Sequence, residues 1–338
     1  MSIIGLGGIG KVHLHNALDL DNANLVAVAD KSKKSRFLAA KLGVKKQYSD
    51  YGELLQDPEI DCVLICLPTF LHAEAAIEAV KQGKHVFVEK PLARNVEEGK
   101  RILAESSKNS VKTMIGYPLH FEPGFRGLKS QIDSGRFGDV VISCATNVSS
   151  GPFSHRASNS IPQPVPSWWL NKELAGGGAL MDLGSHMINL LCWYFGSEID
   201  SVDAVLGHRY NLDFEDYGLA RIRFRTGTLG VVNFGWFSQT AELKVEILGT
   251  IDNKCVRKKS EGSFPTKIIQ ILKGGVVNKS SGLYNELKYF IDCIRYDLDP
   301  YPSVQQGLRD LEIISRAYRN QVQKKESSFG NCESSENK

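Results

Sequence analysis

The sequence predicts a doubly wound parallel sheet followed by an α+β domain with a large, open, mainly antiparallel sheet. Up to about residue 120, short unbroken apolar runs alternate with amphipathic helical segments, as expected for parallel strands buried on both faces. Beyond that point, longer stretches alternate apolar and polar residues, which is typical of a sheet with one covered face. The length, 338 residues, is also near the point at which single cores divide.

The elements of the first domain follow in order from hydrophobic periodicity. Strands are expected at residues 2–4, 25–29, 62–67 and 85–88, and helices from about residue 9 and at 32–42, 73–81 and 96–106. Only Met1 to Ile4 precede the first glycines. The first strand is therefore unusually short for a central strand.

The second domain follows the same reasoning with longer strands. Strands are expected at 140–148, 201–206, 219–224, 228–237 and 243–248, and helices at 179–195, 284–296 and 304–322. We expect a dinucleotide-type domain over residues 1–120 and a substrate-binding and oligomerisation domain over 121–322. The polar end, 323–338, is expected to be disordered.

Composition excludes several classes of protein. The net charge is +3 without a basic stripe, so neither a nucleic-acid nor a membrane surface is expected. No apolar run reaches the roughly 18 to 20 residues of a membrane span. The seven cysteines are scattered, with no CxxC pair, which is typical of reduced thiols in the cytoplasm.

A glycine-rich motif follows the first strand: Gly5, Gly7, Gly8, Ile9 and Gly10 form GxGxxG, and Asp30 ends the next strand. Glycines in this context allow a tight turn, close approach of a pyrophosphate and packing of helix on strand. The sequence therefore predicts a Rossmann domain that binds a dinucleotide. Asp30 favours NAD, because a carboxylate binds ribose hydroxyls and repels a 2′-phosphate. The lysines at 31, 33 and 34 leave NADP open.

Lys90 is a candidate acid or base. It follows an apolar strand and precedes Pro91, which favours an extended conformation at residue 90. An ammonium at the end of a parallel strand lies where ligands of such sheets bind, although a surface lysine would fit the same pattern.

Asp182 and His186 form the second candidate group. Four residues apart on a helix, they share a face that Asn189 and Trp193 continue. The alternative is a structural role, in which His186 is hydrogen-bonded to a neighbouring carboxylate and takes no part in catalysis. Spacing suggests no third ligand, so no metal is expected.

These motifs together resemble the Gfo/Idh/MocA oxidoreductases: the glycine loop, Cys66 to Thr69 with His72, Glu89-Lys90-Pro91, and Gly176 to Gly178 with Asp182 and His186. The resemblance implies an NAD(P)-dependent dehydrogenase acting on a sugar or a cyclitol such as inositol. It also implies a homodimer or homotetramer.

The resemblance further implies roles for single residues. Lys90, Asp182 and His186 would be catalytic, with the choice of Lys90 or His186 as the proton acceptor left open. Cofactor contacts are implied for Leu67, Pro68, Thr69, His72, Glu89 and Lys90, beside the glycine loop and Asp30.

Substrate contacts are implied for Tyr117, His120 and Trp168, with Asp182 and His186. An arginine is frequent in the family where His120 stands here, and Trp168 could instead pack between domains. Two alternatives stay open: a nucleotide-sugar dehydrogenase or reductase, and a catalytically silent dinucleotide-binding regulator.

Overall fold

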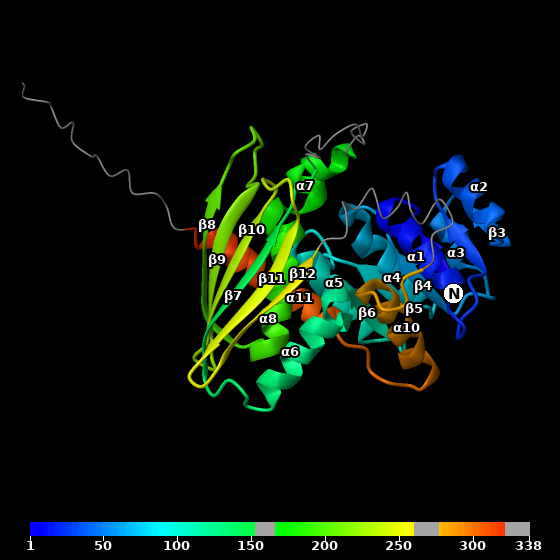
Figure 1. The fold of residues 1–338 in the computed structure, drawn as a ribbon. Coiled ribbons are helices and arrows are strands. Elements are labelled where there is room, and N and C mark those ends of the chain that lie inside the picture. The colour runs from blue at the N-terminus through cyan, green and yellow to red at the C-terminus, as the bar shows by residue number, and fades with distance from the viewer. Residues whose placement is uncertain (153–165, 260–276, 322–338) are drawn as a thin grey trace, which may run out of the picture.

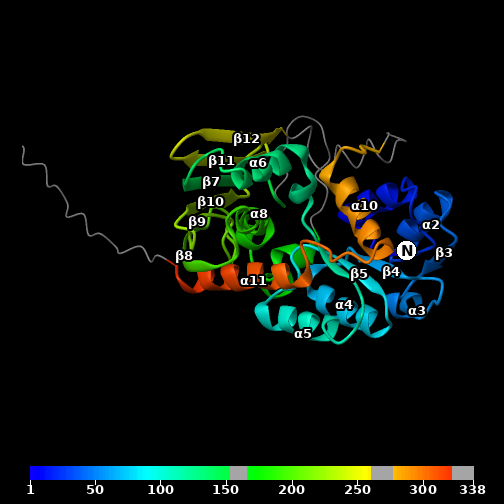
Figure 2. The ribbon, with the colours of Figure 1, turned by 90° about the horizontal axis from the view of Figure 1, so that it is seen from below.

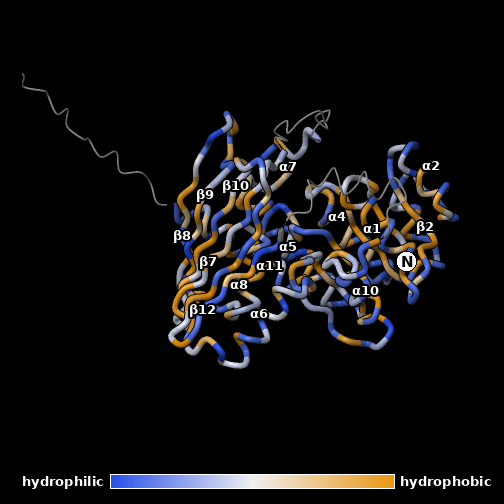
Figure 3. The backbone as a smooth tube through the Cα atoms, viewed as in Figure 1, coloured by the Kyte–Doolittle hydropathy of each residue, from blue (hydrophilic) through white to orange (hydrophobic). Residues whose placement is uncertain are grey.

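The computed structural model of the protein describes residues 1–152, 166–259 and 277–321. The tail predicted to be disordered, 323–338, lies outside the described residues. Two six-stranded sheets stand side by side with helices between them (Figure 1). Hydrophobic residues concentrate along the strands and along the helix faces turned towards them (Figure 3).

The first sheet is wholly parallel, with strand order β3-β2-β1-β4-β5-β6. Its strands are β1 (Ser2–Ile4), β2 (Ala27–Ala29), β3 (Lys46–Tyr48), β4 (Cys62–Ile65), β5 (His85–Glu89) and β6 (Thr113–Gly116). This order is that of a dinucleotide-binding Rossmann sheet, with the reversal of strand order between β1 and β4. The short central strand was expected, whereas β3 and β6 were not.

Helices cover both faces of this sheet (Figure 2). They are α1 (Gly8–Leu18), α2 (Lys33–Lys41), α3 (Tyr51–Leu55), the 3₁₀ turn η1 (Thr69–Leu71), α4 (His72–Lys81), α5 (Val96–Ser106) and, from the far end of the chain, α10 (Gly282–Arg295). Along β5, Phe87 belongs to the core beneath α1 and α10, whereas Val86 and Val88 belong to the core beneath α4 and α5. The continuous apolar runs in the sequence therefore reflect burial on both faces.

The second sheet has the order β12-β11-β7-β10-β9-β8. Its strands are β7 (Val140–Val148), β8 (Ile199–Gly207), β9 (Tyr217–Phe224), β10 (Leu229–Gly235), β11 (Glu242–Gly249) and β12 (Asn253–Lys259). Only the β7–β10 pair is parallel, and the other four pairs are antiparallel. The predicted fold class is confirmed.

One face of the second sheet packs on helices, and the other is open (Figure 2). Within the described residues, the remaining elements are η2 (Pro118–Phe121), α6 (Pro123–Asp133), η3 (Ser167–Leu170), α7 (Lys172–Ala175), the π-helical turn η4 (Leu180–Gly184), α8 (Ser185–Phe195) and α11 (Val304–Arg319). On the open face Val205, Tyr217 and Phe237 are between 40% and 50% exposed. Within the described chain, no helix is long and apolar enough to cross a membrane.

The two last helices join the halves. α10 packs against α1 and β6, although the sequence places it within the range predicted for the second domain. α11 begins with a capping box formed by Ser303 and Gln306, and it packs against α5 of the first half and α8 of the second. The site described next lies where these elements meet.

Candidate active site

Three glycines of the loop after β1 have distinct structural roles. Gly5 has φ +91°, and a Cβ there would lie 2.6 Å from the Cys66 carbonyl oxygen. A Cβ at Gly10 would lie 1.9 Å from the Gly5 carbonyl oxygen, whereas one at Gly7 would meet no described atom within 4 Å. Gly5 thus makes the turn, Gly10 lets α1 approach the strand, and Gly7 leaves an open face for a ligand.

The start of α1 fits a pyrophosphate. Gly7 is its N-cap, and no side chain of the described residues caps the helix. The first backbone N–H groups and the positive end of the helix dipole are therefore available to an anion. The predicted loop residues Gly8 and Ile9 form the first turn of α1.

Asp30 lies at the end of β2, beside the loop. Its carboxylate accepts the Leu6 N–H at 2.6 Å and the Ser32 N–H at 2.7 Å. These bonds use one site on each oxygen and leave capacity for ribose hydroxyls. The Arg36 guanidinium donates to the backbone carbonyls of Asp30 and Lys31, so a cation also stands nearby.

The segments after β4 and β5 approach the same edge of the sheet. Leu67 and Pro68 are half-buried, and Thr69 is buried at the start of η1. The imidazole of His72 is buried, with Nδ1 2.8 Å from the Pro91 carbonyl oxygen and Nε2 2.8 Å from the Leu67 carbonyl oxygen. His72 therefore joins the two segments, and the structure gives no support to its predicted contact with the cofactor.

Glu89 faces the interior. Its Oε1 lies 2.7 Å from His13 Nε2, and its Oε2 accepts the Lys90 N–H at 3.2 Å. Burial and the charge of Glu89 raise the pKa of the nearby Glu286 well above its usual range. Ligand atoms of these three residues, His13, Glu89 and Glu286, lie within 4.8 Å of one another, the only such group of possible metal ligands in the described part of the chain. Asp182 and His186 are not part of it, and their predicted lack of a metal stays a prediction.

Lys90 and Asp182 meet across the two halves. Lys90 Nζ lies 2.7 Å from Asp182 Oδ1 and donates at 3.0 Å to the Asp182 carbonyl oxygen. The other carboxylate oxygen, Oδ2, accepts the Trp236 indole N–H at 3.0 Å. The two side chains of the ion pair are 18% and 15% exposed. Asp182 is therefore fixed from both sides, and it fixes the ammonium in turn.

His186 lies one helical turn beyond Asp182. Burial, with the charges of Lys90 and Lys258, lowers its pKa well below the usual range, so the imidazole is neutral at pH 7. Its Nδ1 is buried without a hydrogen-bond partner among the described residues. Lys258 on β12 is itself paired with Glu122. A neutral imidazole beside a fixed ammonium can accept a proton.

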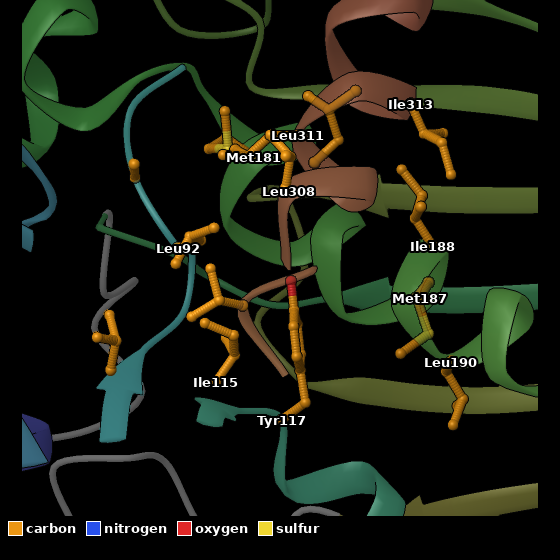
Figure 4. Packing of buried hydrophobic residues seen from close by; sticks show 14 of the residues in the cluster. Leu92, Ile115, Tyr117, Met181, Met187, Ile188, Leu190, Leu308, Leu311 and Ile313 are labelled. Carbon is orange, nitrogen blue, oxygen red and sulfur yellow. The ribbon is translucent and has the colours of Figure 1, made fainter. Parts of the chain in front are cut away.

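Two predicted substrate residues lie behind His186. Tyr117 and His120 are only 2% and 4% exposed. The Tyr117 ring meets the His186 ring edge to face, with centroids 5.9 Å apart, and it is enclosed by apolar side chains (Figure 4). His120 stacks on Trp193 at 4.3 Å. The structure therefore supports a packing role against His186 for Tyr117 and places His120 beside Tyr117 and Trp193, and it gives no support to substrate contact by either.

Trp168 is half-buried between the two halves. The centroid of its ring lies 6.5 Å from that of Phe70 in η1 and 6.4 Å from that of Trp169. Trp169 in turn contacts Trp236 at 6.3 Å. These contacts favour the packing alternative for Trp168 over stacking on a sugar.

Of the three glycines before Asp182, Gly176 and Gly178 make close approaches to protein backbone, and Gly177 lies against the Tyr318 side chain. A Cβ at Gly176, which has φ +87°, would lie 2.6 Å from the Arg94 carbonyl oxygen, and one at Gly178 would lie 1.9 Å from the Glu215 carbonyl oxygen. The predicted close approach is therefore present, but its partners are other segments of the chain. The helix predicted from residue 179 opens with the π-helical turn η4, a feature that often marks functional sites.

Sequence reasoning missed Trp236, His13 and Asp310. Trp236 and His13 carry no local signal that connects them with Asp182 or Glu89. Asp310 does carry one, because it interrupts an apolar stripe that includes Gly307, Leu311 and Ile314 on a helix. A carboxylate on a buried stripe is a candidate functional group.

Comparison with known proteins gives two family matches. The model described as "Oxidoreductase family, NAD-binding Rossmann fold" matches residues 1–117, and that described as "GFO/IDH/MocA C-terminal domain" matches residues 125–251. The scyllo-inositol 2-dehydrogenase (NAD(+)) of Bacillus subtilis is 30% identical over 94% of this chain and 94% of its own length. The myo-inositol 2-dehydrogenase of Thermotoga maritima is 31% identical over 69% of this chain and 67% of its own.

Solved structures share the fold. A probable dehydrogenase from Thermotoga maritima has a TM-score of 0.80 at 25% identity, over 94% of this chain and 95% of its own. A scyllo-inositol dehydrogenase from Lactobacillus casei, solved with NAD(H) and scyllo-inositol, has a TM-score of 0.75 at 23% identity, over 94% and 95%.

Proposed function

The chain belongs to the Gfo/Idh/MocA oxidoreductases and has their NAD-binding Rossmann domain, and on this premise we propose that it oxidises a secondary hydroxyl of a cyclitol or sugar. The observation that carries the proposal is the fixed Lys90–Asp182 pair beside a neutral His186. Inositol dehydrogenases among the relatives support the substrate class.

The cofactor is NAD, held by the loop from Gly5 to Gly10. When bound, it supplies the acceptor for the hydride that leaves the carbinol carbon. Asp30 favours NAD over NADP, because its carboxylate lies where the adenosine ribose would bind and would repel a 2′-phosphate.

In this proposal His186 takes the hydroxyl proton while the carbon–oxygen bond becomes a carbonyl. His186 suits this role because it is neutral at pH 7. Lys90 suits the role of donor, since its ion pair with Asp182 stabilises the ammonium and two of its three N–H groups bond to Asp182. The third can bind a substrate oxygen. Asp182 orients Lys90 and adds negative charge to the site.

The direct test measures NADH formation with a panel of polyols, including myo-inositol, scyllo-inositol and levoglucosan. Turnover is expected with NAD and is expected to vanish in His186→Ala. Absence of turnover with every polyol and both cofactors would overturn the proposal. Inhibition by UDP-sugars would instead favour a nucleotide-sugar substrate, and tight NAD binding without any turnover would favour a regulator.

We also propose that the protein is a cytoplasmic homo-oligomer. The six described cysteines are free thiols, which supports a reducing compartment. The exposed Val205, Tyr217 and Phe237 on the open sheet face support an interface there. Light scattering of the purified protein would give the subunit number, and a monomer would contradict this part of the proposal.

A further inference from the structure

A buried polar network lies behind His186. His120 Nε2 is 2.5 Å from Asn189 Oδ1, and Asn189 Nδ2 donates at 2.9 Å to Asp310 Oδ2. The Tyr117 hydroxyl is also hydrogen-bonded to the Asp310 carboxyl. Each of the four residues is at most 4% exposed. A buried polar group without a hydrogen-bond partner destabilises the fold, so such a network favours one specific arrangement of its side chains.

The donors and acceptors of the network form one consistent series when Asp310 is ionised. A carboxylate only accepts, so the Asn189 amide must turn its NH₂ to Asp310 and its oxygen to His120. That oxygen requires a proton on His120 Nε2, and burial lowers the pKa of His120 to about 4. His120 is therefore a neutral donor at working pH. With Asp310 ionised, every other member of the network can therefore donate or accept in the orientation observed.

The network connects three elements around the proposed base. Tyr117 joins β6 to η2, His120 lies in η2, Asn189 lies on α8, and Asp310 lies on α11. Figure 4 shows Tyr117 among Ile115, Met187 and Leu308, with its hydroxyl directed towards α11. Asn189 follows His186 by three residues on the same helix, and the Tyr117 ring contacts the His186 ring. The Tyr117 ring therefore connects Asp310 to the His186 ring, and Asn189 ties Asp310 to the helix that carries His186.

We propose that Asp310 is a positioning residue for His186: its carboxylate holds the Tyr117 hydroxyl and the Asn189 amide, and the Tyr117 ring keeps the imidazole in the orientation that accepts the substrate proton. This inference rests on the proposed function, because it assigns the proton to His186. It predicts that the reaction responds to the ionisation of a group that touches neither substrate nor cofactor.

The surroundings of Asp310 determine the pH at which this happens. Burial raises the pKa of Asp310 to about 7, opposed by its hydrogen bonds to Asn189 and Tyr117 and by the charge of Arg309. The other titratable groups that face it stay neutral in this range, because burial raises the pKa of Tyr117 and Cys192 well above their usual values and that of Tyr301 to about 12. When Asp310 is protonated, one oxygen can still accept but the other must donate, so at least one of its bonds to Asn189 and Tyr117 has to change.

The first test compares Asp310→Asn with the wild type in kcat, KM and their pH profiles from about pH 5.5 to about pH 9. We expect wild-type kcat to rise through about pH 7, and the variant to lack this rise. We expect kcat in the variant to fall roughly 10- to 100-fold, as for a displaced catalytic group. KM for NAD should not change, because the dinucleotide loop lies elsewhere. Glu312→Gln, an exposed acid-to-amide change on the same helix, should behave like the wild type.

The second measurement does not depend on turnover. In protein labelled with ¹⁵N at histidine, we expect the His120 and His186 ring signals to shift with a midpoint near pH 7 in the wild type and not in Asp310→Asn. Peaks would be assigned with His120→Gln and His186→Gln, and circular dichroism would confirm folding. Wild-type kcat and pH profile in Asp310→Asn would overturn the inference, as would identical histidine titrations. An inactive wild type would refute the proposed function alone, and the histidine titration would still decide the role of Asp310.

Discussion

Replacing Gly7 with alanine should separate cofactor binding from folding. A Cβ at Gly7 meets no described atom within 4 Å, and the residue has φ −68°, so the free energy of unfolding should change by less than about 1 kcal/mol. The same methyl group would occupy the face on which the pyrophosphate should lie. We expect NAD to bind at least about tenfold more weakly, a loss of roughly 1.4 kcal/mol.

Gly10→Ala provides the contrast. Its Cβ would lie 1.9 Å from the Gly5 carbonyl oxygen and 2.9 Å from the carbonyl carbon. Backbone cannot yield as a flexible side chain does, so α1 must move, at a cost of about 1–3 kcal/mol or more in stability. Both folding and binding should therefore suffer.

Isothermal titration with NADH and urea unfolding measure the two quantities separately. Gly127→Ala on α6 is the control, since its Cβ also meets nothing within 4 Å, and it should leave the Kd for NADH unchanged. Wild-type affinity in Gly7→Ala would refute our assignment of the open face. Destabilisation equal to that of Gly10→Ala would refute the packing argument.

Three other substitutions or conditions probe the remaining contacts of the site. Lys90→Met leaves the Asp182 carboxylate without its cation, so kcat should fall roughly 10²- to 10³-fold and the free energy of unfolding by up to about 3 kcal/mol. Lys108→Met, at a lysine whose side chain is 68% exposed, is the control. An unchanged kcat in Lys90→Met would exclude Lys90 from the chemistry. Asp30→Ala should raise the ratio of kcat/KM for NADP to that for NAD by about tenfold or more, and an unchanged ratio would remove Asp30 from cofactor selection. The free energy of unfolding should also depend on Asp310, whose pKa of about 7 in the folded protein exceeds its value of about 4 in the unfolded chain. The contribution of Asp310 to stability is therefore fully present below about pH 4 and is lost as the pH rises through 7. The loss is roughly 4 kcal/mol at most. Urea unfolding should therefore show the wild type weakening relative to Asp310→Asn between about pH 4 and pH 7, and parallel curves would contradict the raised pKa.

The dinucleotide site could be predicted because its determinants are local. Gly5, Gly7 and Gly10 follow a strand and begin a helix, and this order alone requires a tight turn and close packing. The parallel sheet was also predictable from unbroken apolar runs. The three-residue strand β3 (Lys46–Tyr48) was not, because it is only partly buried and carries two polar residues.

The catalytic surroundings were predictable only in part. The spacing of Asp182 and His186 predicted one helical segment for both, with Asn189 and Trp193 on the same edge, whereas a common site with Lys90 was implied only by the family resemblance. The sequence could not show that this edge continues into a buried network, because Tyr117 and Asp310 reach it only through the packing of η2 and α11 on α8. Trp236, which binds Asp182, lies 54 residues further along the chain, where no periodicity connects the two.

The position of α10 has a consequence for how the protein is made. Tyr284, Leu287 and Phe290 of this helix belong to the core beneath α1, so the cofactor-binding half lacks part of its interior until α10 has left the ribosome. We expect a fragment that stops before residue 280 to expose this apolar surface and to aggregate or bind chaperones. The first domain is therefore not expected to fold by itself, although it is synthesised first. A fragment that ends near residue 120 should give little soluble protein unless the α10 segment is supplied with it.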